Sequence, residues 1–435
     1  MLRSCALVLA VGLVAGCRPE GHPSEPYSPS KPPPYFSADA GLPDDGLEDD
    51  AGAVQPPDAG IGDRLDGGDT TPLDAGAPDP LCEAQNPDPP CFEAGCVIEG
   101  AGLRMEIVHV ESGYRALGVS PLGAILAVRL GDPWSRLWAS CDGAKSWAWR
   151  GELDAELRHL VVLADGTFLA GTWKRGGHGL SRSTDSGRTW RTALELGDRR
   201  MLQPESIAEL GGEVFFAEYQ ATPGEDVVPV HLWASEDGGE SWSVRFTFEG
   251  FRHAHGLLAD PKTGALWAFM GDYTGGILRS YDSGHSWQTV LRSTEAVLVD
   301  AVATSKGLLF GTDALYRPLR PAIKLLHTDD SLETLAPLPG PSYSVHALSG
   351  EGFLLGTTRE TGGDVYGPCD LSARLFGSAD GRTWSELLAL PRESPFVYCR
   401  VDPRWSLPAG EAIIELENVK GLGTHGFLIV RVSGR

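Results

Sequence analysis

The sequence STDSGRTW at residues 183–190 returns as SEDGGESW at 235–242 and as SYDSGHSW at 280–287, which defines the pattern SxDxGx[ST]W. Two further copies are imperfect: SCDGAKSW at 140–147 has Ala144 in place of the glycine, and SADGRTW at 378–384 is one residue short. The first four closing tryptophans in chain order are 43, 52 and 45 residues apart, and the next gap is 97. That gap is two periods long, and a degenerate copy, TDDSLETL at 328–335, lies inside it. A period of this length indicates a propeller or another repeat architecture.

The chemistry of the repeated residues predicts a tight turn between two strands. The aspartate carboxylate accepts hydrogen bonds from backbone N–H groups, the glycine takes a positive φ, and the tryptophan folds back onto the sheet as an apolar plug. We therefore expect structural rather than catalytic roles for the aspartates and tryptophans of the five recognisable copies, which are Asp142, Asp185, Asp237, Asp282, Asp380, Trp147, Trp190, Trp242, Trp287 and Trp384.

These turns resemble the Asp-boxes (BNR repeats) of sialidases and of many other bacterial propellers, and the resemblance covers residues 101–435. It implies that each turn joins the two outer strands of a blade and lies away from the usual ligand face. The stretch 216–360, which includes RHAHGLLADPKTGALWAFMGD, also resembles a group of uncharacterised bacterial Asp-box propellers. The second resemblance gives no indication of an enzymatic activity.

Between the turns, each repeat carries two apolar runs separated by a short turn, as in HLVVLA, Asp165-Gly166 and TFLAG at residues 159–171. Each pair predicts a hairpin of inner strands, which gives four strands per blade. The length of the repeat region predicts an all-β propeller of about seven blades, with six, the sialidase number, as the alternative. The last blade, at about 396–433, has no Asp-box, and we expect the strand Leu103 to Val110 to complete it.

Polar residues recur directly after the second strands of successive blades, at Glu218, Asp272, Asp313 and Glu360. The first strand of the fourth blade begins with Arg252-His253-Ala254-His255, and the period of two puts both histidines on one side. All of these positions are expected on the face opposite the Asp-boxes. The six candidate residues for a ligand site above the central channel are therefore His253, His255, Asp272, Glu218, Asp313 and Glu360.

Such a cluster could bind a divalent cation, catalyse a hydrolysis or hydrogen-bond a polar ligand. The alternative is that the histidines are ordinary strand residues and the carboxylates are solvated. The sialidase activity implied by the resemblance requires an Arg-Ile-Pro motif, and the nearest match, Tyr114-Arg115-Ala116, departs from it. Two functions stay open: a surface-displayed propeller that binds a polar ligand, foremost a glycan or surface polymer, and a glycoside hydrolase with a different carboxylate pair.

The first hundred residues predict export and a tether. Residues 6–14 are apolar but too short to span a bilayer, which is typical of a signal peptide, and the string Val14-Ala15-Gly16-Cys17 resembles the lipobox of bacterial lipoproteins. The resemblance implies a signal peptide at 1–16 and a lipid attached to Cys17. Because Arg18 follows the cysteine, it also implies delivery to the outer membrane, on either its periplasmic or its outer side. The segment 17–80 is expected to be a disordered tether spanning roughly 45 Å as a random coil, and 81–100 a cysteine-rich junction.

The net charge restricts the classes of binding partner, and the cysteine content predicts disulfides. The net charge of −23 argues against nucleic-acid binding, although about half of it lies in the tether. The body is expected to be a monomer. Six further cysteines in an exported chain indicate disulfides rather than a zinc site, because the close CxxC pairs of zinc sites are missing. We expect Cys369 to pair with Cys399 and Cys141 to pair within the cluster at 82–96; the six are Cys82, Cys91, Cys96, Cys141, Cys369 and Cys399.

Overall fold

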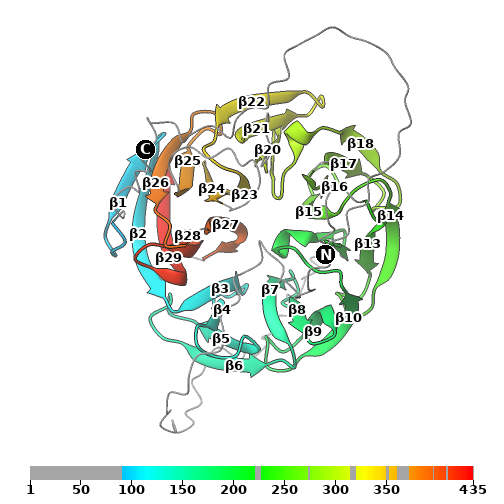
Figure 1. Cartoon of the computed structure of the whole chain (residues 1–435), viewed down its shortest axis with the longest axis horizontal. Helices are drawn as coiled ribbons and strands as arrows, with labels where there is room; N and C mark the ends of the chain where they lie inside the picture. The colour runs from blue at the N-terminus through cyan, green and yellow to red at the C-terminus, as the bar shows by residue number, and fades with distance from the viewer. Residues whose placement is uncertain are drawn as a thin grey trace, which may run out of the picture.

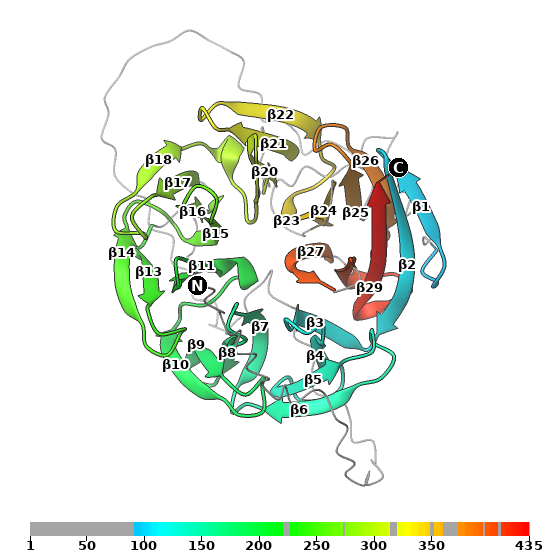
Figure 2. The ribbon, with the colours of Figure 1, turned by 180° about the vertical axis from the view of Figure 1, so that it is seen from behind.

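The computed structural model describes residues 91–220, 227–272, 275–313, 320–348, 352–359, 372–394, 396–407 and 410–434. Within these ranges the chain forms seven antiparallel blades of four strands each, arranged as a ring around a central axis (Figure 1). Seen from behind, the blades follow one another around the same ring in chain order (Figure 2). The predicted all-β propeller is therefore confirmed, with seven blades rather than six.

The first three blades each contain four consecutive strands. Blade 1 comprises β3 (Tyr114–Val119), β4 (Ile125–Arg129), β5 (Arg136–Ser140) and β6 (Ala148–Glu152). Blade 2 comprises β7 (Glu156–Val162), β8 (Phe168–Lys174), β9 (Gly177–Ser183) and β10 (Arg191–Gly197). Blade 3 comprises β11 (Ile207–Leu210), β12 (Glu213–Ala217), β13 (Val230–Ser235) and β14 (Ser243–Phe248), preceded by the 3-10 helix η1 (Pro204–Ser206).

Blades 4 to 6 repeat this order. Blade 4 comprises β15 (Ala254–Asp260), β16 (Ala265–Met270), β17 (Gly276–Ser280) and β18 (Gln288–Leu291), and the 3-10 helix η3 (Thr294–Ala296) follows it. Blade 5 comprises β19 (Val302–Thr304), β20 (Gly307–Gly311), β21 (Ala322–His327) and β22 (Leu332–Pro337). Blade 6 comprises β23 (Ser342–Ala347), β24 (Phe353–Arg359), β25 (Ala373–Ser378) and β26 (Ser385–Leu390).

Blade 7 joins the two ends of the propeller sequence. Its strands β27 (Val397–Ser406), β28 (Glu411–Val419) and β29 (Gly423–Gly434) come from the C-terminal part, and its fourth strand is β2 (Leu103–Ser112). Leu103 pairs with Gly434, and Ser112 pairs with Gly426. The expected closure of the ring is therefore observed, with β1 (Val97–Gly100) added outside β2 as an extra strand.

The repeat turns, by which we mean residues 140–147, 183–190, 235–242, 280–287 and 378–384, join the third and fourth strands of their blades. In the turn at 183–190, the Gly187 N–H donates to Ser183 Oγ at 2.9 Å, and the Thr189 N–H donates to Asp185 Oδ1 at 2.9 Å. The Trp190 indole donates to the Gly187 carbonyl at 3.0 Å, and the φ of Gly187 is +83°. These contacts match the turn chemistry expected from the sequence.

The other turns use the same bonds. Asp142, Asp237, Asp282 and Asp380 each accept backbone N–H groups from their own turn. Ala144, which replaces the glycine, keeps the left-handed conformation at a φ of +67°. The degenerate copy also lies between third and fourth strands, and there Asp330 has a φ of +66°.

The hydrophobic core lies between neighbouring blades. One cluster contains Phe215 and Leu232 of blade 3 together with Leu257 and Met270 of blade 4, all of them buried. Phe168 of blade 2 lies in a cluster with Leu137 of blade 1. The half-buried tryptophans of the repeat turns pack against these clusters, with Trp190 beside the second and Trp287 beside the first. Each blade therefore buries both faces against its neighbours and depends on them for stability.

One of the two expected cysteine pairings is contradicted. Cys91 and Cys96 form a disulfide, whereas Cys399 is a free thiol that is 1% exposed in the core of blade 7. The pairing of Cys369 with Cys399 is thus wrong, because Cys399 points into an apolar cluster and packs there as a small hydrophobic group. Cys141 is disulfide-bonded, and its partner lies outside the described residues.

Several expectations fall on residues that the structure does not describe. They concern the signal peptide, Cys17 and the tether, and the side chains of Cys82, Glu360 and Cys369. In the ranges that are described, no helix has the length and apolar character needed to cross a membrane.

Candidate functional site

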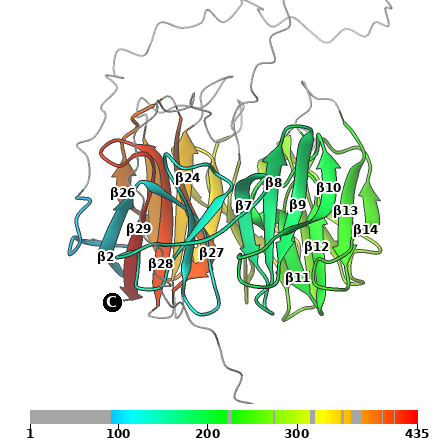
Figure 3. The same cartoon turned by 90° about the horizontal axis from the view of Figure 1, so that it is seen from below.

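The topology separates the two faces of the ring. The strands run roughly along the ring axis (Figure 3), so the start of each first strand and the end of each second strand lie at one face. The repeat turns lie at the other. We call the first of these the upper face. His253 precedes β15, Asp272 follows β16 and Asp313 follows β20, so all three lie at the upper face as expected.

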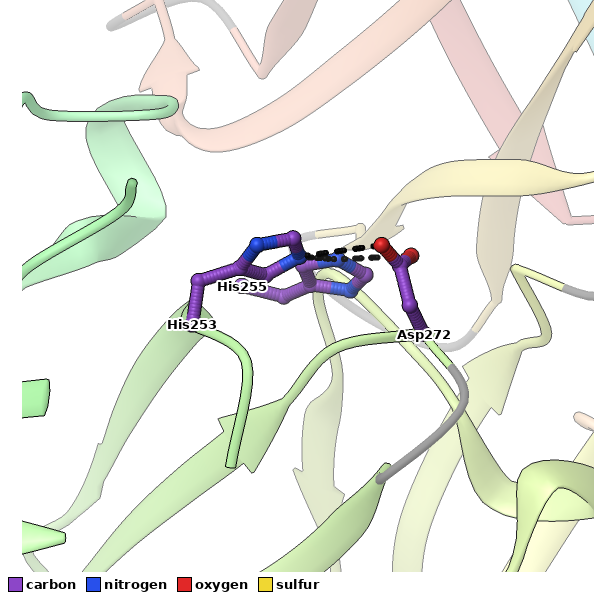
Figure 4. Close-up of side chains that lie close together, drawn as sticks. All are labelled: His253, His255 and Asp272. Carbon is purple, nitrogen blue, oxygen red and sulfur yellow. Dashed lines mark hydrogen bonds and ion pairs between the residues drawn. The ribbon is translucent and has the colours of Figure 1, made fainter. Parts of the chain in front are cut away.

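The two histidines come together with Asp272 (Figure 4). The Nε2 atoms of His253 and His255 are 3.1 Å apart. Asp272 Oδ2 is 3.4 Å from His253 Nε2, and Asp272 Oδ1 is 3.6 Å from His255 Nε2. Asp313 joins from blade 5, with its Oδ2 atom 3.6 Å from His255 Nδ1. Four of the six candidate residues therefore form one polar cluster.

A β-bulge, rather than simple strand alternation, orients His255. In the pairing of β15 with β16, Ala254 is opposite Met270 and Gly256 is opposite Phe269, so His255 is the extra residue of the bulge. A bulge redirects a side chain and is common beside functional sites. The bulge depends on the pairing of β15 with β16, which the sequence of β15 alone does not reveal. The expectation that the two histidines lie close together is therefore right, but strand alternation is not the full cause.

The backbone of the loop after β16 is shaped around the two rings. A Cβ atom on Gly271 would lie 2.3 Å from His255 Nε2 and 2.5 Å from His253 Nε2, so only glycine fits there. Asp272 has a φ of +55°, a left-handed conformation that is costly for a residue with a Cβ. Such strain is retained where the surroundings enforce it, and it is concentrated at functional sites.

The electrostatics of the cluster favour one charged carboxylate and at least one neutral ring. Burial and the charge of His255 lower the pKa of His253 to about 3. Burial opposes the charge of Asp272, but the hydrogen bond and charge of His255, and the charges of His253 and Arg252, hold the pKa of Asp272 well below its usual range. Arg252 is ion-paired with Asp272. His253 is therefore neutral and Asp272 ionised at neutral pH.

Glu218 belongs to a different set of contacts. Its carboxylate is ion-paired with Arg199 and accepts the Trp233 indole N–H at 2.6 Å. It also accepts the backbone N–H of His231 at 3.2 Å. Only its backbone carbonyl reaches blade 4, where it accepts the Ala254 N–H at 3.2 Å. Glu218 thus ties β13 of its own blade to the segment that connects blades 2 and 3, and its carboxylate is turned toward those partners.

The cavity at the upper mouth of the channel is lined by other residues. It has a volume of about 90 Å³ and lies between blades 1, 2, 6 and 7. None of the five candidate residues that the structure describes lines it. Its lining includes four arginines, three aromatic residues, two histidines and two glutamates, namely Arg115, Arg158, Arg200, Arg400, Tyr343, Phe396, Tyr398, His159, His178, Glu415 and Glu417.

Buried ion pairs hold the polar wall of this cavity. Arg115 Nε donates to Glu415 Oε1 at 3.0 Å, and both side chains are almost fully buried. Arg400 donates to both carboxylate oxygens of Glu205 at 2.6 and 2.7 Å and to Asp402 at 3.2 Å. Removing one partner of such a pair would leave a buried charge without compensation. The wall is therefore rigid and carries charges of both signs.

One histidine of this wall, His159, is kept neutral. Burial, followed by the charges of Arg115, Arg400, Arg158 and Arg200, lowers the pKa of His159 well below its usual range. At neutral pH its ring therefore offers one donor and one acceptor nitrogen.

Aromatic rings form the rest of the cavity and its rim. Tyr398 packs against Phe396 and Tyr343, with ring centroids 6.1 Å apart in both pairs. The guanidinium of Arg158 lies 5.6 Å from the ring centroids of both Trp134 and Trp173. Arg158 and Tyr343 are the extra residues of β-bulges in β7 and β23. A β-bulge therefore orients each of these side chains, as it does for His255.

Sequence reasoning missed this cavity, although a signal was present. The first strands YRALGV, ELRHLVV and VYCRVD each carry an arginine within an otherwise mostly apolar run. A charged residue in a buried strand is rare unless it is paired. In the sequence Arg115 stands out only as a departure from the Arg-Ile-Pro motif, yet its side chain lies in the cavity wall.

No protein-family model and no curated protein matches the chain. Among solved structures, it is similar to the GH74 enzyme of Niastella koreensis, with 13% identity, a TM-score of 0.48 and coverage of 72% of this chain and 58% of that chain. The chain therefore spans well under two thirds of that enzyme. YCF48 from Cyanidioschyzon merolae is 14% identical with a TM-score of 0.47, covering 75% and 98%. The oligogalacturonate lyase of Vibrio parahaemolyticus is 8% identical with a TM-score of 0.50, covering 77% and 95%. At these identities the likenesses concern the fold alone, and the propeller arrangement itself rests on the strand order of this chain.

Proposed function

We propose that this protein is a binding propeller whose ligand is a polar molecule, foremost a glycan, held in the cavity at the upper mouth of the channel. The observation that carries the proposal is the lining of that cavity. Aromatic rings from blades 6 and 7 lie beside arginine and glutamate side chains from blades 1, 2 and 7. A wall with apolar faces and a few fixed polar groups is typical of small-molecule sites.

The chemistry of the wall suits a sugar. Sugar hydroxyl groups both donate and accept hydrogen bonds, and this wall offers guanidinium donors beside carboxylate acceptors. The rings of Tyr343 and Tyr398 offer flat apolar surface for the C–H face of a pyranose. The volume of about 90 Å³ is below the usual range of roughly 300–1,000 Å³ for ligand pockets, so one sugar unit at a chain end is the expected occupant.

A glycan-array screen of the full chain, followed by calorimetry on the hits, tests the proposal. Tyr343→Ala should weaken binding about tenfold, since the loss of one aromatic contact costs about 0.5–1.5 kcal/mol beyond its buried area. The matched control is Tyr281→Ala, which removes a ring that is 63% exposed in a repeat turn. Equal affinities of the two variants for a bound glycan, or no glycan bound at all, would remove the basis of the proposal.

A glycoside hydrolase is the second candidate, and one observation favours it. Glu415 and Glu417 are alternate residues of β28, and both line the cavity. Two carboxylates beside a bound sugar are the usual catalytic equipment of such enzymes. Release of reducing sugar from an array hit, abolished by Glu417→Gln, would establish hydrolysis. A glycan that binds and stays intact would leave binding as the function.

We also propose that the protein is a monomer anchored through lipid on Cys17 to the outer membrane. This proposal rests on the lipobox-like string before Cys17 and on the acidic, proline-rich segment after it. It would place the upper face within reach of surface polymers.

A further inference from the structure

We propose that His253, His255 and Asp272 form a binding site for a divalent transition-metal ion of the zinc type. This site is separate from the proposed glycan cavity, since none of the three residues lines that cavity. One ligand atom from each residue lies within 4.8 Å of the other two. Figure 4 shows both rings turned toward the carboxylate.

The hydrogen bonds of the rings determine which nitrogens are free. His253 Nδ1 is 3.0 Å from the carbonyl oxygen of Gln220, and His255 Nδ1 is 3.2 Å from that of Leu298. A carbonyl oxygen only accepts, so each Nδ1 carries a hydrogen, and each Nε2 of a neutral ring then carries a bare lone pair. The two Nε2 atoms lie 3.1 Å apart. Two nitrogens at this distance face each other across either a shared proton or a metal ion, and a metal ion would bind the lone pairs of both neutral rings.

The spacing of the donors fits a tetrahedral ion. Zinc–nitrogen and zinc–oxygen distances of about 2.0–2.2 Å place neighbouring ligand atoms about 3.3–3.5 Å apart. The observed separations are 3.1 Å between the two nitrogens, 3.4 Å from His253 Nε2 to Asp272 Oδ2 and 3.6 Å from His255 Nε2 to Asp272 Oδ1. The two carboxylate distances involve different oxygens of Asp272, so an ion fits between the three side chains once a side-chain shift brings one of these oxygens toward both nitrogens.

The surroundings support the ligands as those of metal sites do. Metal-binding histidines usually donate their other N–H to a carbonyl or carboxylate, which fixes the ring and its tautomer. Here the carbonyls of Gln220 and Leu298 accept, and Asp313 Oδ2 lies 3.6 Å from His255 Nδ1. Arg252 is ion-paired with Asp272. It competes for one carboxylate oxygen, while the other faces His255.

The donor set selects the kind of ion. Two imidazole nitrogens and one carboxylate suit zinc and its transition-metal neighbours, whereas magnesium and calcium prefer oxygen ligands throughout. Three protein ligands leave a fourth position for water or another molecule. Gln220 lies between β12 and β13 of blade 3, and Leu298 precedes blade 5, so the ion would also connect three blades at the upper face.

Metal titration of the purified full chain tests the site. After removal of metal with EDTA and dialysis, we expect one equivalent of Zn²⁺ to bind in calorimetry, and Co²⁺ to give the visible absorption of a four-coordinate site. Asp272→Asn should weaken Zn²⁺ binding at least tenfold, because changes around metal ligands alone cost about 10–100-fold. Asparagine tolerates the left-handed backbone of this position, so the variant should fold. His253→Gln should have the same effect.

The control is His346→Gln, which changes a buried histidine of β23 outside the cluster and should leave Zn²⁺ affinity unchanged. Zn²⁺ that binds Asp272→Asn and His253→Gln as tightly as the unaltered chain would overturn the proposal. So would the absence of stoichiometric binding. A hydrogen held between the two Nε2 atoms in nitrogen NMR, and retained when Zn²⁺ is added, would show that a proton occupies the site and that the proposal is wrong. None of these outcomes bears on glycan binding.

Discussion

Ser186 occupies a backbone position that glycine fills elsewhere. Its φ is +60°, and the equivalent residues of two other repeat turns are Gly143 and Gly238. The left-handed conformation costs a residue with a Cβ about 1–2 kcal/mol, part of which the flexibility of unfolded glycine offsets. Ser186→Gly should therefore stabilise the protein by about 0.5–1 kcal/mol in urea unfolding. Thr184→Gly, at a neighbouring position without a positive φ, should destabilise it, and equal shifts for both variants would contradict the argument.

Trp190 packs between blades 1 and 2. Its ring is half-buried beside Phe168, and its indole N–H bonds to the Gly187 carbonyl. Trp190→Ala should lower the free energy of unfolding by about 2–3 kcal/mol, less than the roughly 3–5 kcal/mol of a fully buried aromatic residue. Trp149→Ala, whose side chain is 59% exposed on β6, should change it by less than about 0.5 kcal/mol. Activity plays no part in this prediction, since the turn lies opposite the upper face.

At the scale of elements, the repeat turns should make the protein sensitive to acid. Hydrogen bonds from the hydroxyl and backbone of Ser146 lower the pKa of Asp142 to about 2, those of Ser286 do the same for Asp282, and backbone N–H groups lower the pKa of Asp380 to about 2. An aspartate with a depressed pKa contributes stability above its unfolded pKa, near 4, and loses that contribution as the pH falls toward the folded value. The melting temperature should fall between about pH 4 and pH 2, and Asp142→Asn should reduce the slope. A melting temperature that is flat over this interval would contradict the turn electrostatics.

The hairpins and turns were predictable because each depends on residues close together in sequence. The pattern SxDxGx[ST]W contains its own hydrogen-bond donors, acceptors and positive-φ glycine. Each copy can therefore form the turn without help from distant parts of the chain. The bulge at His255 was not predictable, because it is defined by the register against β16. Alternation nevertheless placed both histidines near Asp272, since the loops after second strands return to the same face.

At the scale of the whole molecule, the cavity shows why distant contacts escape sequence reasoning. Arg115 and Glu415 are 300 residues apart, and Arg400 and Glu205 are 195 apart, yet both pairs are in direct contact. Only the closed ring brings them together. The blade number was predictable from the spacing of tryptophans, whereas the free thiol of Cys399 was not, because burial in the core cannot be read from the spacing of cysteines.

Ring closure should make β2 essential for stability. Ile107 is 0% exposed in the core of blade 7, so Ile107→Ala should cost about 2–5 kcal/mol in chemical unfolding. The control on the same strand is Glu106→Ala, which removes only exposed ion pairs to Arg104 and Arg431 and should cost less than about 1 kcal/mol. Similar costs for both variants would mean that β2 contributes little to closing the ring.

The lipid on Cys17 is the only membrane attachment that the sequence predicts. Cys17→Ser should therefore yield a protein that appears in the soluble fraction after cell fractionation, with the melting temperature of the released body unchanged. Asp39→Ser, a substitution within the acidic segment, should leave the protein in the membrane fraction. Persistent membrane association of Cys17→Ser would show that the anchor is assigned wrongly.

The pairing of β2 with β29 has a consequence for biogenesis. Chain synthesis proceeds from the N-terminus, so β2 is made long before its partner β29. Leu103 can pair with Gly434 only after the rest of the propeller has been synthesised. Contacts of such sequence separation form slowly, and a strand with an open edge can pair with other chains in the meantime. The interval before β29 is available would therefore be the vulnerable one in folding, and a chaperone that shields the edge of β2 would raise the yield of folded protein.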